Sequence, residues 1–272
     1  MTTATMIRLN VGNSEVIIYE KGAYLYSWKI GNKDVLLKGN LELPTKGGMA
    51  LLIPYANRVA GARYVFNGVE YVLPRKWWPP EEDNAIHGLV FDKEFSIDDV
   101  GHNYVRLSYV LRHSGYPTIL AINVEYTLYS DKLKTVIIVR NIGNSEAPLV
   151  VGAHPYFIVS DDWDIEVSGE SYRCESINKI PTGRLIRDRL RRGDWDDCFI
   201  VDDPIILKSS YSKIIISREN MRYLHVYTGA QGAVALEPMS GAPDAYHNGM
   251  GLLIIRPGEK MNFSFTIKAI LE

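Results

Sequence analysis

Cysteine is scarce in this sequence: Cys174 and Cys198 are the two cysteines among 272 residues. They lie far apart and form no C-x-x-C pair, so the pattern favours two reduced, buried thiols over a disulfide framework or a zinc site. The histidines show no compact ligand spacing either. We therefore expect no metal site.

An excess of charge of one sign is also missing. The 30 basic and 32 acidic residues give a net charge of −2, which excludes a general attraction to nucleic acid or to an anionic membrane. No hydrophobic run approaches the length of a membrane span. The first residues, Met1–Arg8, contain no hydrophobic region of the kind found in secretion signals, so we expect a cytoplasmic protein. The oligomeric state has no signal in the sequence.

Several cofactor and nucleophile motifs are absent as well. We find no phosphate-binding G-x-x-x-x-G-K-[ST] loop, no G-x-S-x-G elbow and no H-E-x-x-H helix. The short stretch Gly249-Met-Gly251 does not extend to a dinucleotide fingerprint. The simpler class is therefore acid/base chemistry on a small organic molecule, without a cofactor.

Strand signals dominate what is present. Asn67-Gly68 lies between two β-rich segments, 62–66 and 69–73, and tolerates the positive φ angles of a tight hairpin turn. Further hairpins are predicted over 94–112 and 121–141, and short strands follow to the end of the chain. One short segment, 185–192, reads as helix. The chain predicts an all-β fold, a large and mostly antiparallel β-sandwich, in one domain over residues 1–272.

The segment Val151–Phe157 is the strongest functional candidate. It places His154 between small residues and an aromatic pair, and Pro155 is expected to end or bend the strand because it has no N–H to donate. A histidine presented at a strand end is suited to acid/base work. A hydrogen-bonded structural histidine fits the same pattern.

Four other residues are functional candidates because of their local sequence context. Arg58 follows a hydrophobic run, His87 lies in a long loop, Asp196 stands among bulky residues, and Glu237 directly follows the strand 233–236. Partial burial of Glu237 raises its pKa toward that of a useful base. Each has an ordinary alternative as a surface or loop residue. Trp77 and Trp78 fit a sugar-stacking surface or a core equally well.

The order of these motifs resembles the aldose 1-epimerase (galactose mutarotase) family from about residue 50 to the end. The motifs that carry the resemblance are Asn57-Arg58, His87-Gly88, Gly152-x-His154-Pro-Tyr-Phe, Trp195-Asp196-x-x-Phe199, Glu237-Pro-x-x-x-x-Pro-Asp-Ala and Pro257-Gly258-Glu259. The resemblance implies a large β-sandwich that interconverts the α and β anomers of a free aldose without a metal or cofactor.

The resemblance also implies roles for individual residues. Glu237 matches the general base for the anomeric hydroxyl, and His154 matches the general acid for the ring oxygen. Arg58, His87 and Asp196 match positions that bind the monosaccharide substrate. The chain departs from better-known members at Ala153, where they carry Asn, and at Pro238-Met239, where they carry Thr-Gln.

Three alternative functions remain open from the sequence. The family includes hexose-6-phosphate epimerases, and five arginines within 184–192 would be available to hold a phosphate, although a solvated segment is favoured. A non-catalytic carbohydrate-binding protein would need neither His154 nor Glu237. A glycoside hydrolase usually needs two carboxylates, for which Glu237 with Asp196 or Asp244 would be the candidates.

Overall fold

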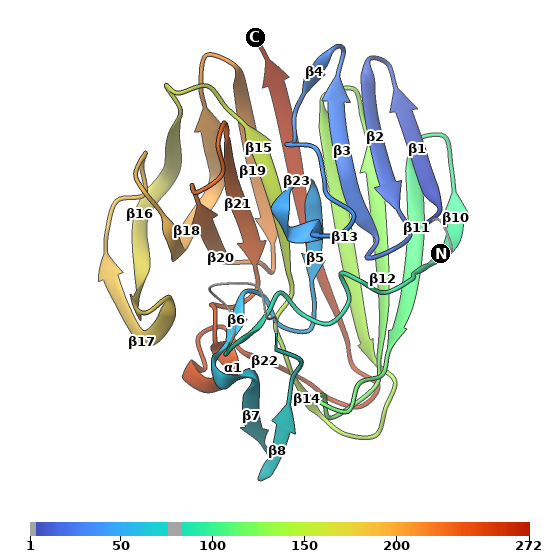
Figure 1. Cartoon of the computed structure of the whole chain (residues 1–272), viewed down its shortest axis with the longest axis vertical. Helices are drawn as coiled ribbons and strands as arrows, with labels where there is room; N and C mark the ends of the chain where they lie inside the picture. The colour runs from blue at the N-terminus through green and yellow to red at the C-terminus, as the bar shows by residue number, and fades with distance from the viewer. Residues whose placement is uncertain (1–3, 76–82) are drawn as a thin grey trace.

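Two antiparallel β-sheets packed face to face make up the protein, as the computed structural model shows (Figure 1). The structure describes residues 4–75 and 83–272. In Figure 1 the blue strands near the N-terminus lie in front of the green strands from the middle of the chain. The predicted β-sandwich is therefore confirmed.

The front sheet carries His154, Asp196 and Glu237, three of the five site residues predicted from the sequence. Following its pairings from one edge, the strands are β1 (Met6–Val11), β2 (Ser14–Tyr19), β3 (Tyr24–Ile30), β5 (Met49–Leu52), β15 (Gly152–Ile158), β21 (Ala233–Met239), β20 (Tyr223–Tyr227), β18 (Asp196–Lys208), β16 (Asp164–Ile177) and β17 (Ile180–Arg187).

The back sheet is built from hairpins that are consecutive in the chain and from the C-terminal strand. Its strands are β10 (Ser96–Val100), β11 (Tyr104–Leu111), β12 (Leu120–Leu128), β13 (Lys132–Asn141), β23 (Lys260–Leu271) and β19 (Ser212–Glu219). β19 pairs with the second half of β18, while the first half of β18 pairs with β20. The long strand β18 therefore belongs to both sheets.

Alternation of side chains explains why these segments form a sandwich. In β12 the residues at every second position, from Leu120 to Leu128, are buried, and the residues between them are half-buried or exposed. β13 repeats the pattern. Because successive side chains of a strand point to opposite faces, each strand contributes one hydrophobic face to the core between the sheets.

Short strands, turns and one helix extend or connect the long strands. They are β4 (Lys33–Asp34), β6 (Arg58–Val59), β7 (Arg63–Phe66), β8 (Val69–Val72), β9 (Ala85–Ile86), β14 (Ala147–Leu149), β22 (Leu253–Ile255), the helix α1 (Ala245–Asn248) and two 3₁₀ turns, η1 (Pro44–Lys46) and η2 (Ala60–Ala62). The Asn67-Gly68 hairpin is confirmed, since β7 pairs with β8 and both turn residues have positive φ.

The strand prediction at Pro155 was wrong. β15 continues through Pro155 to Ile158 without a break. On one side Pro155 stands opposite Met49 of β5, and on the other the pairing with β21 is interrupted between Gly152 and Tyr156. The missing N–H of Pro155 therefore falls where β15 makes no ladder with β21, so the strand tolerates it.

The helix prediction over residues 185–192 was also wrong. Residues Ile180–Arg187 form β17, an antiparallel partner of β16, and the hairpin between them turns at Asn178 and Lys179, which both have positive φ. Pairing with β16 overrides the weak helical preference of a short, arginine-rich segment. Among the described residues, no helix is long and hydrophobic enough to cross a membrane.

Gly88 offers a test of how tightly the loop next to His87 is held. It has a φ of +79°, and a Cβ added to it would lie 2.4 Å from the carbonyl oxygen of Ile53. Gly68 has a φ of +77°, but a Cβ added there would meet nothing within 4 Å. Both substitutions to Ala carry the cost of a left-handed backbone, about 1–2 kcal/mol.

We expect Gly88→Ala to lower the free energy of unfolding clearly more than Gly68→Ala, because a clash with backbone cannot be relieved by a side-chain rotation. Urea denaturation of both variants, with m-values matching the wild type, measures the difference. Equal losses in the two variants would show that the chain around Ile53 yields to the added methyl group.

Candidate active site

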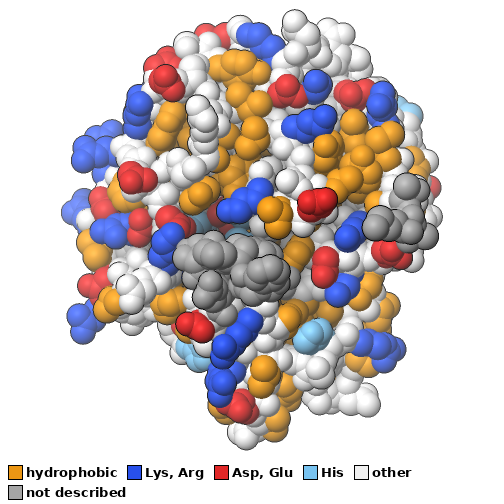
Figure 2. Space-filling view, viewed as in Figure 1, with side chains coloured by type: hydrophobic (Ala, Val, Ile, Leu, Met, Phe, Trp, Pro, Cys, Tyr) orange, Lys and Arg blue, Asp and Glu red, His pale blue; other side chains and the backbone are white. Residues whose placement is uncertain are grey.

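One pocket gathers all five of the site residues predicted from the sequence. It opens on the face shown in Figure 2, where histidine and acidic atoms are visible inside a hollow. Its described lining residues are Thr45, Lys46, Asn57, Arg58, Ile86, His87, His154, Tyr156, Lys179, Asp196, His225, Tyr227 and Glu237. Most of these side chains are polar or charged, as in a site that binds a polar small molecule.

A row of residues across the front sheet brings the central groups together. Glu237 of β21 stands opposite His225 of β20. The register that pairs Gly152 with Met239, and Tyr156 with Ala235, sets His154 opposite Glu237 on the other side. Neighbours in register point to the same face of a sheet, so all three side chains reach the same pocket.

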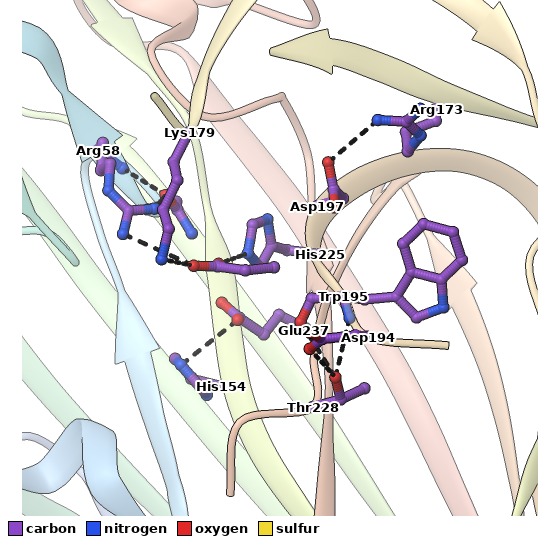
Figure 3. Close-up of polar contacts among 12 residues, drawn as sticks. Arg58, His154, Arg173, Lys179, Asp194, Trp195, Asp197, His225, Thr228 and Glu237 are labelled. Atoms are coloured by element: carbon purple, nitrogen blue, oxygen red, sulfur yellow. Dashed lines mark hydrogen bonds and ion pairs between the residues drawn. The ribbon is translucent and has the colours of Figure 1, made fainter. Parts of the chain in front are cut away.

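The imidazole of His154 lies against the carboxyl group of Glu237. Its Nε2 is 3.3 Å from Glu237 Oε1, as Figure 3 shows, and the two side chains are 5% and 1% exposed. The ring stacks on Tyr156, with centroids 4.6 Å apart, and meets His87 edge to face at 5.2 Å. Packing on both sides thus holds the imidazole in one orientation toward Glu237.

Asp196 is held by three cationic or hydrogen-bonding groups. Its Oδ1 is 2.9 Å from His225 Nε2, and its Oδ2 pairs with Lys179 and lies 4.0 Å from Arg58 (Figure 3). The backbone of the preceding residue, Trp195, makes two hydrogen bonds with Thr228: its N–H donates to the Thr228 hydroxyl at 2.8 Å, and its carbonyl accepts from the Thr228 N–H at 3.0 Å. The start of β18 is therefore fixed beside β20.

Two loop residues close the other side of the pocket. His87 donates its backbone N–H to the carbonyl of Asn57 at 2.9 Å, and the side-chain oxygen of Asn57 accepts from the backbone and guanidinium of Arg58. Asn57 and His87 both have positive φ. Residues with this conformation are uncommon and cluster at functional sites, where the surroundings hold them in place.

Burial moves the pKa values of the central pair in opposite directions. Burial raises the pKa of Glu237 well above its ordinary value, with a smaller rise from Asp196. Burial, followed by the nearby His225, lowers the pKa of His154 to about 3, although its own backbone and Asp196 oppose the shift. Burial therefore favours the neutral form of both groups, a carboxylic acid facing a neutral imidazole, across the 3.3 Å contact.

Burial and neighbouring charges also set the charge states of His87 and Asp196. Burial, with the nearby His154 and Arg58, lowers the pKa of His87. The pKa of Asp196 is lowered despite its burial, because His225, Lys179 and Arg58 stabilise its carboxylate. His87 is thus a neutral hydrogen-bonding group and Asp196 an anion throughout the neutral range.

Unused hydrogen-bonding atoms also mark the pocket. Buried atoms without a partner include Glu237 Oε2 and the Nδ1 atoms of His87, His154 and His225. Leaving a buried polar atom unpaired costs roughly 1–3 kcal/mol, so such atoms are rare unless a ligand or water pairs with them. All four of these atoms belong to residues that line the pocket.

Sequence reasoning missed His225, Lys179 and Lys46. His225 lies in an ordinary hydrophobic strand, and the two lysines lie in turns, where charged residues are common, so no local signal marks them. The five arginines within 184–192 are exposed, and none is among the described residues that line this pocket. Trp77 and Trp78 lie outside the described residues.

No group of three or more His, Cys, Asp or Glu side chains able to hold a metal ion occurs in the described part of the chain. Cys174 and Cys198 are buried free thiols. Extending the register that pairs Tyr172 with Ile200 and Arg173 with Phe199 sets them opposite each other on β16 and β18.

Comparison with known proteins matches the chain to a family model described as aldose 1-epimerase, over residues 5–268. The uncharacterised protein YihR of Escherichia coli is 27% identical over 83% of this chain and 80% of its own length. Galactose mutarotase of Rattus norvegicus is 26% identical over 78% of this chain and 76% of its own. A crystal structure of a putative aldose 1-epimerase from Escherichia coli K12 has a TM-score of 0.86 at 22% identity, covering 99% of this chain and 100% of that one.

The protonation states of the histidines are directly measurable. We expect His154 to stay neutral as the pH falls through 6.5, because burial opposes its charged form, and His247 to become charged above 6.5, because it bonds Asp244 at 2.6 Å. Carbon-13 NMR of histidine-labelled protein, assigned with His154→Asn and His247→Gln, gives both values. A His154 signal that titrates at or above that of His247 would contradict the burial argument.

Proposed function

Because the chain belongs to the aldose 1-epimerase family, we propose that it interconverts the α and β anomers of an aldose by opening and reclosing the sugar ring. The observation that carries the proposal is the buried contact of His154 Nε2 with Glu237 Oε1 at 3.3 Å. The reaction moves one proton off the anomeric hydroxyl and another onto the ring oxygen. A carboxyl–imidazole pair that holds a single proton can perform both transfers.

In the proposed mechanism Glu237 accepts the proton of the anomeric hydroxyl while His154 donates a proton to the ring oxygen. The ring C–O bond breaks, the electron pair of the hydroxyl oxygen forms the aldehyde, and rotation about C1–C2 exposes the other face. Reclosure runs the same transfers backward. The resting pair has the right number of protons for this step, because moving one proton from Glu237 to His154 creates the reactive state.

The remaining pocket residues bind and orient the sugar in this proposal. Arg58 and His87 supply donors from one side, and Asp196 accepts from the other. Tyr156 and Tyr227 offer aromatic surface next to the acid/base pair. A rigid arrangement of this kind lowers the barrier by positioning the ring before the proton transfers begin.

The alternative functions make different demands on the same residues. A binding protein has no need for a buried pair whose pKa values are displaced in opposite directions, which is costly to maintain. A glycoside hydrolase needs a carboxylic acid beside the glycosidic oxygen and a second carboxylate across the bond. Here Asp196 is engaged by His225 and Lys179, and His154 occupies the place beside Glu237.

Substitutions separate the chemistry from binding. Glu237→Gln keeps the shape but cannot accept the proton, and His154→Asn removes an effective proton donor, so we expect each to lower kcat by roughly 10²–10⁴. His87→Asn is expected to retain more of its kcat and to show the larger relative rise in KM. Anomer exchange of glucose and galactose followed by NMR saturation transfer measures both constants.

The matched control is Lys213→Met, an exposed change on β19 outside the pocket, which is expected to exchange anomers like the wild type. Wild-type kcat in Glu237→Gln would end the base assignment, and sugar binding by the wild type without anomer exchange would favour a binding protein. Release of reducing sugar from a glycoside, with no anomer exchange, would favour a hydrolase.

The pH dependence follows from the shared proton. Activity is lost on the acid side when the pair takes up a second proton, and burial places that limb below the ordinary histidine value of 6.5. It is lost on the alkaline side when the pair gives up its only proton, and burial places that limb above the ordinary glutamate value of 4.5. We expect a bell-shaped profile of kcat/KM with its plateau across neutral pH. A profile that rises steadily with pH through a single ionisation would contradict the shared proton.

A further inference from the structure

Asp244 is a buried acid that the proposed chemistry does not use. It is 4% exposed and lies in the segment that joins β21, the strand of Glu237, to the helix α1. It is not among the described residues that line the pocket. Burying a carboxyl group is costly unless hydrogen bonds or charges compensate it, so the partners of Asp244 indicate what it does.

The partners of Asp244 belong to the backbone around β6, the short strand that carries Arg58. The N–H of Asp244 donates to the carbonyl of Arg58 at 2.7 Å, and its Oδ1 accepts from the N–H of Ala60 at 2.8 Å. The carbonyl of one residue and the N–H two residues later point to the same side of an extended strand. Asp244 therefore bonds β6 along one side as a neighbouring strand would.

The strand β6 depends on contacts of this kind. Among the described residues its strand partner is β9, in a two-stranded sheet apart from the large sheets. Such a pair is marginally stable by itself. β9 holds one side of β6 and Asp244 holds the other, and Figure 1 shows α1, which follows Asp244, close to β6. The contact thus ties Arg58 to the chain that continues from the strand of Glu237.

The backbone of Asp244 limits which residues can make this contact. Its φ of 58° and ψ of 25° lie in the left-handed region, where Asp and Asn are more common than other residues with a side chain. The imidazole of His247 lies 2.6 Å from the same Oδ1 and helps to fix the carboxyl group. Asn tolerates this backbone and keeps an acceptor, whereas Gly tolerates it without one.

We propose that Asp244 is a positioning residue that holds Arg58 in the place where it binds the sugar. The inference rests on the proposed function, in which Arg58 donates to the sugar beside the acid/base pair. The guanidinium lies 3.0 Å from Asn57 Oδ1 and 4.0 Å from Asp196 Oδ2. A shift of β6 would change both distances and move the donors away from the ring, and small misplacements of this kind are costly.

The test compares Asp244→Gly, which removes the acceptor, with Asp244→Asn, which keeps it. We expect Asp244→Gly to raise KM for glucose and galactose by about tenfold, the size of a lost hydrogen bond to a charged group. Its kcat should stay within about threefold of the wild type, because the acid/base pair is untouched. Asp244→Asn and the exposed control Lys213→Met should keep wild-type values. NMR saturation transfer measures both constants.

A double-mutant cycle shows whether Asp244 acts through Arg58. In an Arg58→Met background, Asp244→Gly should change KM by less than about twofold, because the group that Asp244 positions is gone. The same tenfold rise in both backgrounds overturns the inference. So does a wild-type KM in Asp244→Gly, or a KM in Asp244→Asn as high as in Asp244→Gly. If Asp244→Gly does not fold, Asp244→Ser, whose side chain is shorter, replaces it in every comparison.

A measurement without sugar separates this inference from the proposed function. NMR of protein with isotope-labelled arginine follows the guanidinium of Arg58, assigned with Arg58→Met. We expect its signals to shift in Asp244→Gly and to stay in place in Asp244→Asn. The result holds even if the wild type exchanges no anomers, an outcome that would end the proposed function. Signals of Arg58 that do not change in Asp244→Gly overturn the positioning role whatever the activity.

Discussion

Burial of the contact between His154 and Glu237 is the constraint on which the rest of the site depends. Both side chains are almost fully removed from solvent. Burial raises the pKa of Glu237 and lowers that of His154, so the neutral form of each group is favoured. A buried ion pair in this place would be costly, whereas a neutral pair holding one proton is not. In the proposed mechanism, the transfer of a single proton across this contact gives the charged arrangement.

The sheet makes this contact possible. His154, Glu237 and His225 come from three strands that are adjacent in the front sheet but distant in the sequence. The interruption of pairing between β15 and β21 falls where His154 and Glu237 face one another, and it also accommodates Pro155. One local irregularity in an otherwise continuous sheet thus serves both the backbone and the reactive pair.

Short segments and turns outside the long strands supply other residues of the pocket. Arg58 and His87 come from short segments held in uncommon backbone conformations, and Lys46 comes from the turn η1, which is hydrogen-bonded to Tyr156. These residues surround the rigid pair with donors and positive charge. The sheet therefore supplies the buried carboxyl–imidazole pair, and the loops supply the groups around it.

Local patterns in the sequence determined much of the architecture. Alternating hydrophobic residues in segments such as 121–141, and the turn at Asn67-Gly68, predict strands and hairpins because side-chain period and turn geometry are local properties. The motif order predicted the family and the five site residues that share the pocket. The short helix at 185–192 was wrong because a pairing partner, β16, decides the conformation of a segment with weak preferences of its own.

Only the tertiary structure decided which further residues join the five predicted site residues in the pocket. His225 and Lys46 carry no local signal, and they reach the pocket because strand register and a hydrogen-bonded turn bring them there. The same holds for charge: a sequence shows that Glu237 and His154 are ionisable, but their burial sets which of them holds the proton. Register, burial and long-range electrostatics are sums over distant parts of the chain, so no stretch of sequence read alone contains them.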